Sequence, residues 1–231
     1  MRFSPEHLVI APVLIPLIAG ALQLFLDDRG RKLKATLSVL ATVALLIISV
    51  WLLRFTYVNS HASAGKITVY LLGNWPPPFA INLVLDHLSA MMLTLTATLA
   101  LPALIFSLGR WHKSGAHFHT LFLLLLMGLN GAFLTGDLFN LFVFFEIMLA
   151  ASYGLVLHGS GLLRVKAGLH YIAINLVASF LFLIGVALIY GVTGTLNMAD
   201  LALKIPQISA SGYMLLESGA AVLSVAFLLQ S

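Results

Sequence analysis

The chain has 231 residues, of which 61% are hydrophobic and 9% charged, and its formal net charge is +4. With a mean hydropathy of +1.05, this composition excludes an ordinary soluble domain and indicates a membrane protein. The lack of cysteine excludes disulfides, cysteine-based zinc sites and a thiol nucleophile, and the basic residues lie in short clusters typical of membrane orientation rather than of nucleic-acid binding.

Apolar runs of about the length that spans a bilayer recur along the chain. They predict an all-α, multi-pass membrane protein with six complete transmembrane helices and a partial seventh. The six runs are residues 8–26, 35–53, 88–108, 120–136, 138–157 and 171–192. The seventh begins near Ser218 and continues to the end of the sequence.

The longest connection, residues 58–81, reads "VNSHASAGKITVYLLGNWPPPFAI". Its "KITVY" stretch predicts a brief strand, because β-branched and aromatic residues favour strands. The Trp-Pro-Pro-Pro run that follows is incompatible with the middle of a helix. We therefore expect this connection to lie at the membrane interface.

Basic side chains are divided unevenly between the two sides that alternate loops define. One side carries Arg29, Arg31, Lys32, Lys34, Arg110, Lys113, Arg164 and Lys166, and the other carries Arg2, Arg54, Lys66 and Lys204. Because cytoplasmic loops carry the excess of lysine and arginine, the richer side is predicted to be cytoplasmic. This places the N-terminus outside.

The last apolar run, "SGAAVLSVAFLLQS", has no polar flank. A helix that ended part-way through a bilayer would leave carbonyl groups without partners, at a cost of several kcal/mol each. We therefore expect residues 1–231 to form one transmembrane domain that is the N-terminal piece of a longer protein.

One carboxylate, Glu146, lies inside the fifth apolar run, within "NLFVFFEIMLAASYGL". It follows Asp137 by nine residues, which is about 14 Å along a helix and places it near the bilayer midplane. Hydrocarbon favours the neutral acid and a nearby cation or water favours the carboxylate, so this group is suited to take up and release a proton. Ala150, Tyr153 and Gly154 on its face leave room for a neighbouring helix or for water. The alternative is a hydrogen-bonded structural acid.

The sixth apolar run carries a polar stripe. Tyr171, Asn175 and Ser179 recur every four residues, with His170 beside the first. Such a stripe is expected to face protein or water. Histidine is the side chain whose charge ordinarily changes near neutral pH, which makes His170 the better candidate for a proton relay. Ordinary interhelical hydrogen bonds are the alternative for each residue.

Two acids precede predicted helices. Asp86 stands at the head of the third and Asp137 at the head of the fifth, where a carboxylate caps a helix and complements its dipole. The sequence has no phosphate-binding glycine loop, no dinucleotide glycine pattern and no Ser-His-Asp arrangement. It therefore does not support ATP-driven transport.

Histidines are the remaining candidate ligands. His112, His117 and His119 share one connection, but their flanks also suit an ordinary solvated loop. Nothing in the sequence pairs His87 with His170 around a haem. We predict neither a metal site nor a cofactor.

Three longer stretches carry a family signal: "GNWPPPFAINLVLDHLSAMMLTLT" (73–96), "GDLFNLFVFFEIMLAASYGL" (136–155) and "LHYIAINLVASFLFLIGVALIYGVTGTLNMADLA" (169–202). They closely resemble the D-type subunit of the Mrp-type (also Mnh or Pha) multisubunit cation/proton antiporters, which is similar to the antiporter-like membrane subunits of respiratory complex I. The likeness runs over nearly the whole chain. The run "YGVTGTLNMADL" favours the Mrp D-type subunit over its complex I relatives.

The resemblance implies a subunit about twice this length, with about fourteen helices in an inverted-repeat antiporter fold that contains broken helices. In the family, an acid in the fifth helix belongs to a proton pathway and works against a lysine in the seventh. The acid maps onto Glu146. The lysine motif, "FLxKAxxWPL", would begin at Phe227, so that Gln230 stands where lysine is expected. Glutamine forms hydrogen bonds but carries no positive charge, which puts independent transport by this chain in doubt.

The leading hypothesis is a membrane subunit of a Na+ or K+/proton antiporter complex in a bacterial inner membrane. It would be a secondary transporter, not an enzyme, with other antiporter subunits as partners and no cofactor. One alternative is a proton-pumping subunit of a complex I-like or hydrogenase assembly, which would be classed with oxidoreductases. The other is a non-transporting membrane scaffold in which Glu146 is structural.

Overall fold

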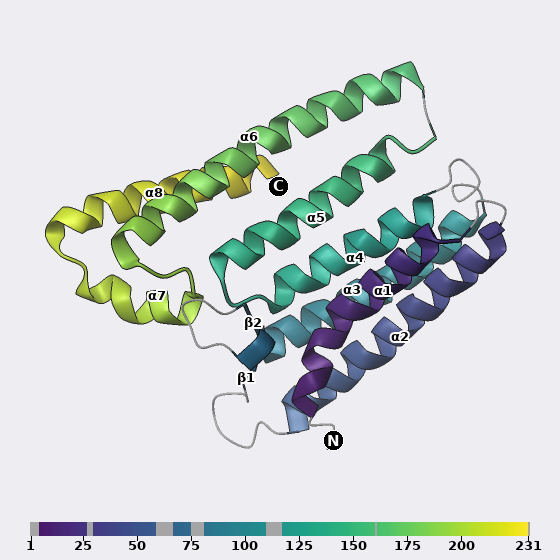
Figure 1. Ribbon diagram of the computed structural model, residues 1–231, viewed down its shortest axis with the longest axis horizontal. Helices are drawn as coiled ribbons and strands as arrows, with labels where there is room; N and C mark the ends of the chain where they lie inside the picture. Colours follow the sequence, from purple (N-terminus) through teal and green to yellow (C-terminus); the bar gives the residue numbers. More distant parts are fainter. Residues whose placement is uncertain are drawn as a thin grey trace.

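The computed structural model describes residues 5–26, 30–58, 67–74, 81–109, 117–159 and 161–230. Its longer helices run roughly side by side along the long axis of the molecule (Figure 1). Within these residues the helices are α1 Ala11–Leu24, α2 Arg31–Val58, α3 His87–Leu108, α4 Phe118–Leu134, α5 Leu138–Val156, α6 Leu162–Thr193, α7 Met198–Lys204 and α8 Ala210–Gln230. Short 3-10 helices cover Pro5–Ile10, Leu72–Asn74 and Ile205–Gln207.

Six helices in the described part of the chain are long and apolar enough to cross a membrane, and α4 is a shorter apolar helix of 17 residues. The predicted all-α, multi-pass fold is therefore confirmed. The starts of two predicted helices are wrong by eight or nine residues. The last helix begins at Ala210, not near Ser218. The prediction placed the start of this helix after Glu217, but Glu217 lies within α8 on an exposed face. Similarly, α6 begins at Leu162, since its first turns include basic residues whose long side chains can keep their charges in water.

The helices form a continuous row in which α5 is the middle member (Figure 1). Helices α1 to α4 pack together, α5 lies between α4 and α6, and α8 packs along α6. Aliphatic side chains such as Leu93, Leu123 and Leu134 fill the first group. Phe182 and Ala226 are fully buried between α6 and α8.

A two-stranded hairpin lies at one end of the bundle (Figure 1). Strand β1, Thr68–Leu71, pairs antiparallel with β2, Asn82–Leu85. The strand predicted within "KITVY" is thus present as β1, whereas its partner was not predicted. The Trp-Pro-Pro-Pro run lies outside the described residues.

The hairpin continues into the connections between helices. The Gly136 N–H, between α4 and α5, donates to the Asn82 carbonyl of β2 (3.2 Å). The Gly136 carbonyl accepts from the Met198 N–H (2.9 Å), and Asp137 pairs with Asn197 in an antiparallel bridge. These bonds join the start of α5 to the start of α7 and satisfy backbone groups that would be costly to leave unpaired near a membrane.

Helix α1 contains a proline whose missing N–H is compensated by another helix. Pro16 cannot donate to the carbonyl of Pro12, four residues earlier. Asn130 of α4, only 3% exposed, donates its Nδ2 to that carbonyl at 3.0 Å. The amide therefore ties α4 to α1 at the point where the helix lacks its own hydrogen bond.

Candidate functional site

Glycines on α4 fix the position of α5. A Cβ on Gly131 would lie 2.2 Å from the ring of Phe144, and one on Gly128 would lie 2.7 Å from the backbone nitrogen of Met148. No side chain fits at either position, so the two helices approach closely and the Phe144 ring covers Gly131. This contact leaves Glu146 on a different face of α5, toward α6.

Glu146 is half-buried and hydrogen-bonded to α6. Its helix is capped by Asp137, whose side chain accepts from the N–H groups of Phe139 (2.8 Å) and Asn140 (3.0 Å). The Ser179 hydroxyl of α6, which is 5% exposed, donates to Oε1 of Glu146. A hydroxyl both donates and accepts, so Ser179 can hold the carboxylate and also take part in proton exchange with it.

The rest of the predicted stripe lies along the same α5–α6 interface. The Tyr171 hydroxyl is 3.2 Å from Oγ of Ser152, and its ring meets the ring of Tyr153 edge-on at 5.5 Å. Asn175 is 3% exposed and donates Nδ2 to the Tyr171 carbonyl (2.8 Å). Its Oδ1 is buried and has no hydrogen-bond partner within the described chain. Polar groups therefore line this interface from Ser152 to Glu146.

His170 is not part of this line. Its ring is exposed, and its Nδ1 lies 2.8 Å from the carbonyl of Lys166 in the same helix. Nine residues, about 14 Å along α6, separate it from Ser179. The structure therefore brings Tyr171, Asn175 and Ser179 to the interface with α5 and leaves His170 at the exposed end of the helix.

Comparison with known proteins shows which family the chain resembles. Residues 135–231 match the family described as NADH:quinone oxidoreductase/Mrp antiporter, TM. The chain is 58% identical over 226 residues to the D-type subunit of a probable K(+)/H(+) antiporter of Rhizobium meliloti, an alignment that covers 98% of this chain and 42% of that protein. Residues 135–231 therefore resemble the transmembrane region of this family, and nearly the whole chain resembles an antiporter D-type subunit.

Two further comparisons agree with this family. The D-type subunit of the Na(+)/H(+) antiporter of Alkalihalophilus pseudofirmus is 43% identical over 211 residues, which cover 90% of this chain and 41% of that one. The Mrp complex from Dietzia sp. DQ12-45-1b contains a chain that superposes with a TM-score of 0.83 at 35% identity, covering 96% of this chain and 40% of that one. The resemblance to an Mrp D-type subunit is thus confirmed. The chain spans about two fifths of the length of these relatives.

Gln230, where the sequence resemblance leads us to expect the family lysine, lies about level with Ser179. Helices α6 and α8 are antiparallel, and the rings of Phe182 and Phe227 meet edge-on with their centroids 5.4 Å apart. About one turn further along each helix come Ser179 and Gln230, which therefore share one height. Oε1 of Gln230 is buried without a hydrogen-bond partner in the described chain.

The two helix-start acids both act as caps. Asp86 forms a capping box at the start of α3, accepting from the Ser89 N–H (2.7 Å) while the Ser89 hydroxyl accepts from the Asp86 N–H (2.9 Å). Asp137 caps α5 as described above.

The candidate ligand histidines are dispersed. His119 is 3% exposed with its ring against Phe118, and Nδ1 of His87 lies 3.4 Å from the hydroxyl of Thr56. His112 lies outside the described residues. Within the residues that the structure describes, no group of three or more His, Cys, Asp or Glu could hold a metal ion.

Ser152 is a site residue that the sequence analysis missed. It lies about 120° around α5 from Glu146, so helical spacing does not assign it to the same face. Only the position of Tyr171 on the neighbouring helix reveals its contact.

The room that the sequence predicts beside Gly154 is taken up by α4, because a Cβ at Gly154 would lie 2.8 Å from Cδ1 of Leu121 in that helix. A neighbouring helix, not water, occupies that side of α5.

Proposed function

We propose that this chain is part of a membrane subunit of a monovalent cation (Na+ or K+)/proton antiporter complex, in which Glu146 takes up and releases the proton. The observation that carries the proposal is a half-buried carboxylate inside an apolar, membrane-length helix, with a serine donor from the next helix. Intramembrane acids are costly and usually functional. The D-type relatives, named for K(+)/H(+) and Na(+)/H(+) antiport, support the substrate class.

The proposed membrane location and partners are those expected for an antiporter subunit. The subunit would lie in a bacterial inner membrane with its N-terminus outside, as the distribution of basic residues predicts. Its partners would be the other subunits of the antiporter complex. Ion gradients supply the driving force, so no cofactor and no enzymatic reaction are required. Because this chain spans about two fifths of its relatives, the proposed activity belongs to the whole subunit in its complex.

The proton route would follow the α5–α6 interface. Ser152 and Glu146 are six residues apart, about 9 Å along α5. Over this distance Tyr171, Asn175 and Ser179 supply donors and acceptors from α6. A water at Oδ1 of Asn175 would satisfy that buried acceptor and bridge the gap between Tyr171 and Ser179. His170 would stand at the entrance, on the side predicted to be cytoplasmic.

A carboxylate at Glu146 would need a nearby positive charge to balance it. In the family a lysine of the seventh helix has this role, and Gln230 occupies its position, level with Ser179. Glutamine can hydrogen-bond to a carboxyl group but cannot carry a positive charge. We therefore expect this chain to be inactive by itself.

A second candidate is a proton-pumping subunit of a complex I-like assembly. It is favoured by the family model, which joins Mrp antiporters with NADH:quinone oxidoreductases. The two candidates share Glu146 and differ in the source of energy. Co-purification of the native complex decides between them, since only the second requires redox subunits.

Substitution of Glu146 tests the proposal. In everted vesicles that contain the full-length subunit and its partners, Glu146→Gln should lower cation-induced dissipation of a pH gradient at least about tenfold, because the amide cannot release a proton. Glu217→Gln, which changes an exposed carboxylate on α8, is the matched control and should retain activity. Activity of Glu146→Gln within about twofold of wild type would instead support the scaffold alternative, in which Glu146 is structural.

A further inference from the structure

An open cavity lies between the end of α6, the start of α8 and the short helix α7 that joins them. Its volume is about 630 Å³, and nine residues line it. This size is within the range of small-molecule sites. Glu146 is not among the lining residues, so the cavity is separate from the proposed proton route.

The cavity lies at a level where membrane meets water. It opens beside the last turn of α6, which ends at Thr193, and the first turns of the apolar span Gly212–Gln230. Two tyrosines flank this level: Tyr190 is 49% exposed and Tyr213 is 46% exposed. Tyrosines collect at membrane interfaces because their rings are amphipathic. A ligand in this cavity would therefore lie at headgroup depth.

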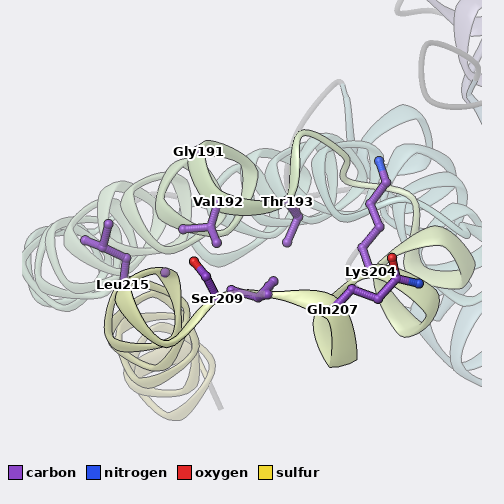
Figure 2. A pocket seen from close by; sticks show the side chains of 9 residues that line it. Gly191, Val192, Thr193, Lys204, Gln207, Ser209 and Leu215 are labelled. Atoms are coloured by element: carbon purple, nitrogen blue, oxygen red, sulfur yellow. The ribbon is translucent and has the colours of Figure 1, made fainter.

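The lining is amphipathic. Figure 2 shows Lys204 and Gln207 at one end of the cavity and Leu215 at the other, with Val192 and Ser209 between them on the side of Leu215. The nine lining residues include one cation and no carboxylate. The polar end offers an ammonium and an amide N–H₂, which are donors suited to phosphate oxygens. The apolar end offers a surface for hydrocarbon, which a free inorganic anion would not cover.

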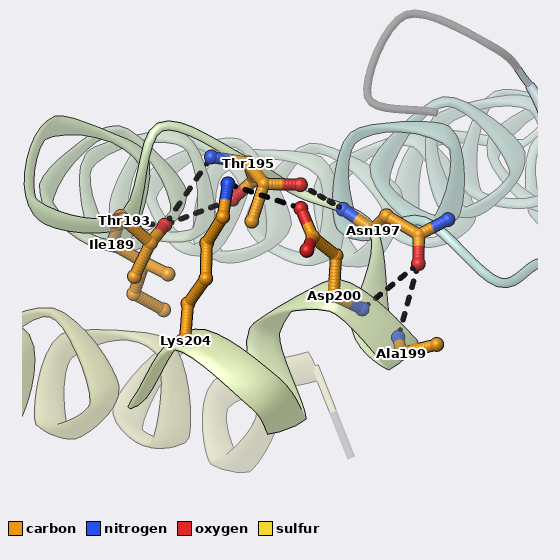
Figure 3. Close-up of polar contacts among 7 residues, drawn as sticks. All are labelled: Ile189, Thr193, Thr195, Asn197, Ala199, Asp200 and Lys204. Atoms are coloured by element: carbon orange, nitrogen blue, oxygen red, sulfur yellow. Dashed lines mark hydrogen bonds and ion pairs between the residues drawn. The ribbon is translucent and has the colours of Figure 1, made fainter. Parts of the chain in front are cut away.

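Lys204 is held in place from outside the cavity (Figure 3). Its Nζ lies 3.1 Å from Oδ2 of Asp200, one turn earlier in α7. A hydrogen bond from Thr195, together with Lys204, keeps the pKa of Asp200 below its usual value, so this carboxylate stays charged. Asn197 fixes the start of α7 by accepting from the N–H groups of Ala199 and Asp200. The ammonium has three donors, and one ion pair leaves two of them for a ligand.

We propose that this cavity binds the phosphate headgroup of a membrane glycerophospholipid. The phosphate would lie against Lys204 and Gln207, and the start of an acyl chain would lie along Val192 and Leu215. The amphipathic lining and the interfacial depth together favour a lipid over a soluble phosphate. The site requires no transport activity and does not depend on the role of Glu146.

The test measures lipid binding by the detergent-purified, delipidated full-length subunit with its partner subunits. Dioleoylphosphatidylglycerol is titrated, and the rise in the thermal melting midpoint gives the half-saturating concentration. Lys204→Gln should raise that concentration about fivefold, since one cation near a membrane surface contributes about that factor. Lys204→Arg should bind as wild type does. Lys166→Gln, a cation at the opposite end of α6, is the matched control and should also leave binding unchanged.

Three results would overturn the proposal. Equal half-saturating concentrations for wild type and Lys204→Gln would exclude Lys204 as a ligand. An equal stabilisation by dioleoylglycerol, which lacks the phosphate, would show that only hydrocarbon is bound. Stabilisation by inorganic phosphate that matches the lipid and depends on Lys204 would show an anion site, not a lipid site.

Discussion

Helix α5 has two interfaces of opposite character. Toward α4, Gly128 lies against the α5 backbone at Met148, and Gly131 lies against the ring of Phe144. A Cβ at either glycine would lie within 2.7 Å of an atom of α5. Toward α6, hydroxyl, amide and carboxyl groups meet, and one acceptor, Oδ1 of Asn175, is buried with no hydrogen-bond partner among the described residues.

The difference indicates how α5 can be held in position by one neighbouring helix and carry a polar site on the side of the other. Close packing has few alternative arrangements, since interiors are packed like organic crystals. The α4 interface therefore fixes the rotation of α5 and the direction of Glu146. The polar α6 interface contains groups that can exchange protons, which close apolar packing cannot supply.

The largest effect is expected at Gly131. Gly131→Val would place a Cβ 2.2 Å from the Phe144 ring and should destabilise the protein by about 3 kcal/mol, because the crowded helices must move apart. Reversible unfolding in mixed micelles measures the free energy. Gly191→Val is the control, since nothing lies within 4 Å of its Cβ position. Equal stability of the two variants would refute close packing as the support of α5.

A smaller loss is expected at Asn130, on the α1 side of α4. Asn130→Ala should cost about 1–3 kcal/mol, because the Pro12 carbonyl loses its donor. Pro16→Ala restores the backbone N–H for that carbonyl, so Asn130→Ala should cost much less in that background. A double-mutant cycle measures this coupling. Additive effects of the two substitutions would contradict the assignment of Asn130 as the compensating donor.

The smallest effect is expected on the polar side. Tyr171→Phe removes the hydroxyl that contacts Ser152 and should slow proton-coupled transport in vesicles about fivefold, the factor expected for one hydrogen bond. Tyr190→Phe, on the same helix beyond the proposed route, should leave the rate unchanged. If both variants transport at the wild-type rate while Glu146→Gln is inactive, the proton reaches Glu146 by another route and the role of Glu146 stands.

Much of this arrangement is readable from the sequence. Length and apolarity alone locate the spanning helices, and the four-residue spacing of Tyr171, Asn175 and Ser179 indicates a face that meets another part of the protein. Boundaries were less predictable where charge interrupts a helix. Glu217 lies within α8, and Arg164 and Lys166 lie within α6, because a helix end at an interface tolerates charged side chains.

Contacts between distant segments could not be predicted. The bridge between Asp137 and Asn197 joins loops that are sixty residues apart, and no local pattern marks it. Ser152 lies on a different side of α5 from Glu146, and its partner is on another helix. The cavity beside Lys204 depends on the angle between α6, α7 and α8. Each feature arises from tertiary packing, which helical spacing does not encode.

Under the proposed function, Glu146 changes its protonation state during transport. Infrared difference spectroscopy of the reconstituted full-length complex, with and without an imposed cation gradient, measures this directly through the carbonyl stretch of a protonated carboxyl group. We predict a band that appears and disappears with the gradient in wild type and is absent in Glu146→Gln. The same gradient-dependent band in both proteins, or no band in an actively transporting wild type, would contradict the assignment of the proton to Glu146.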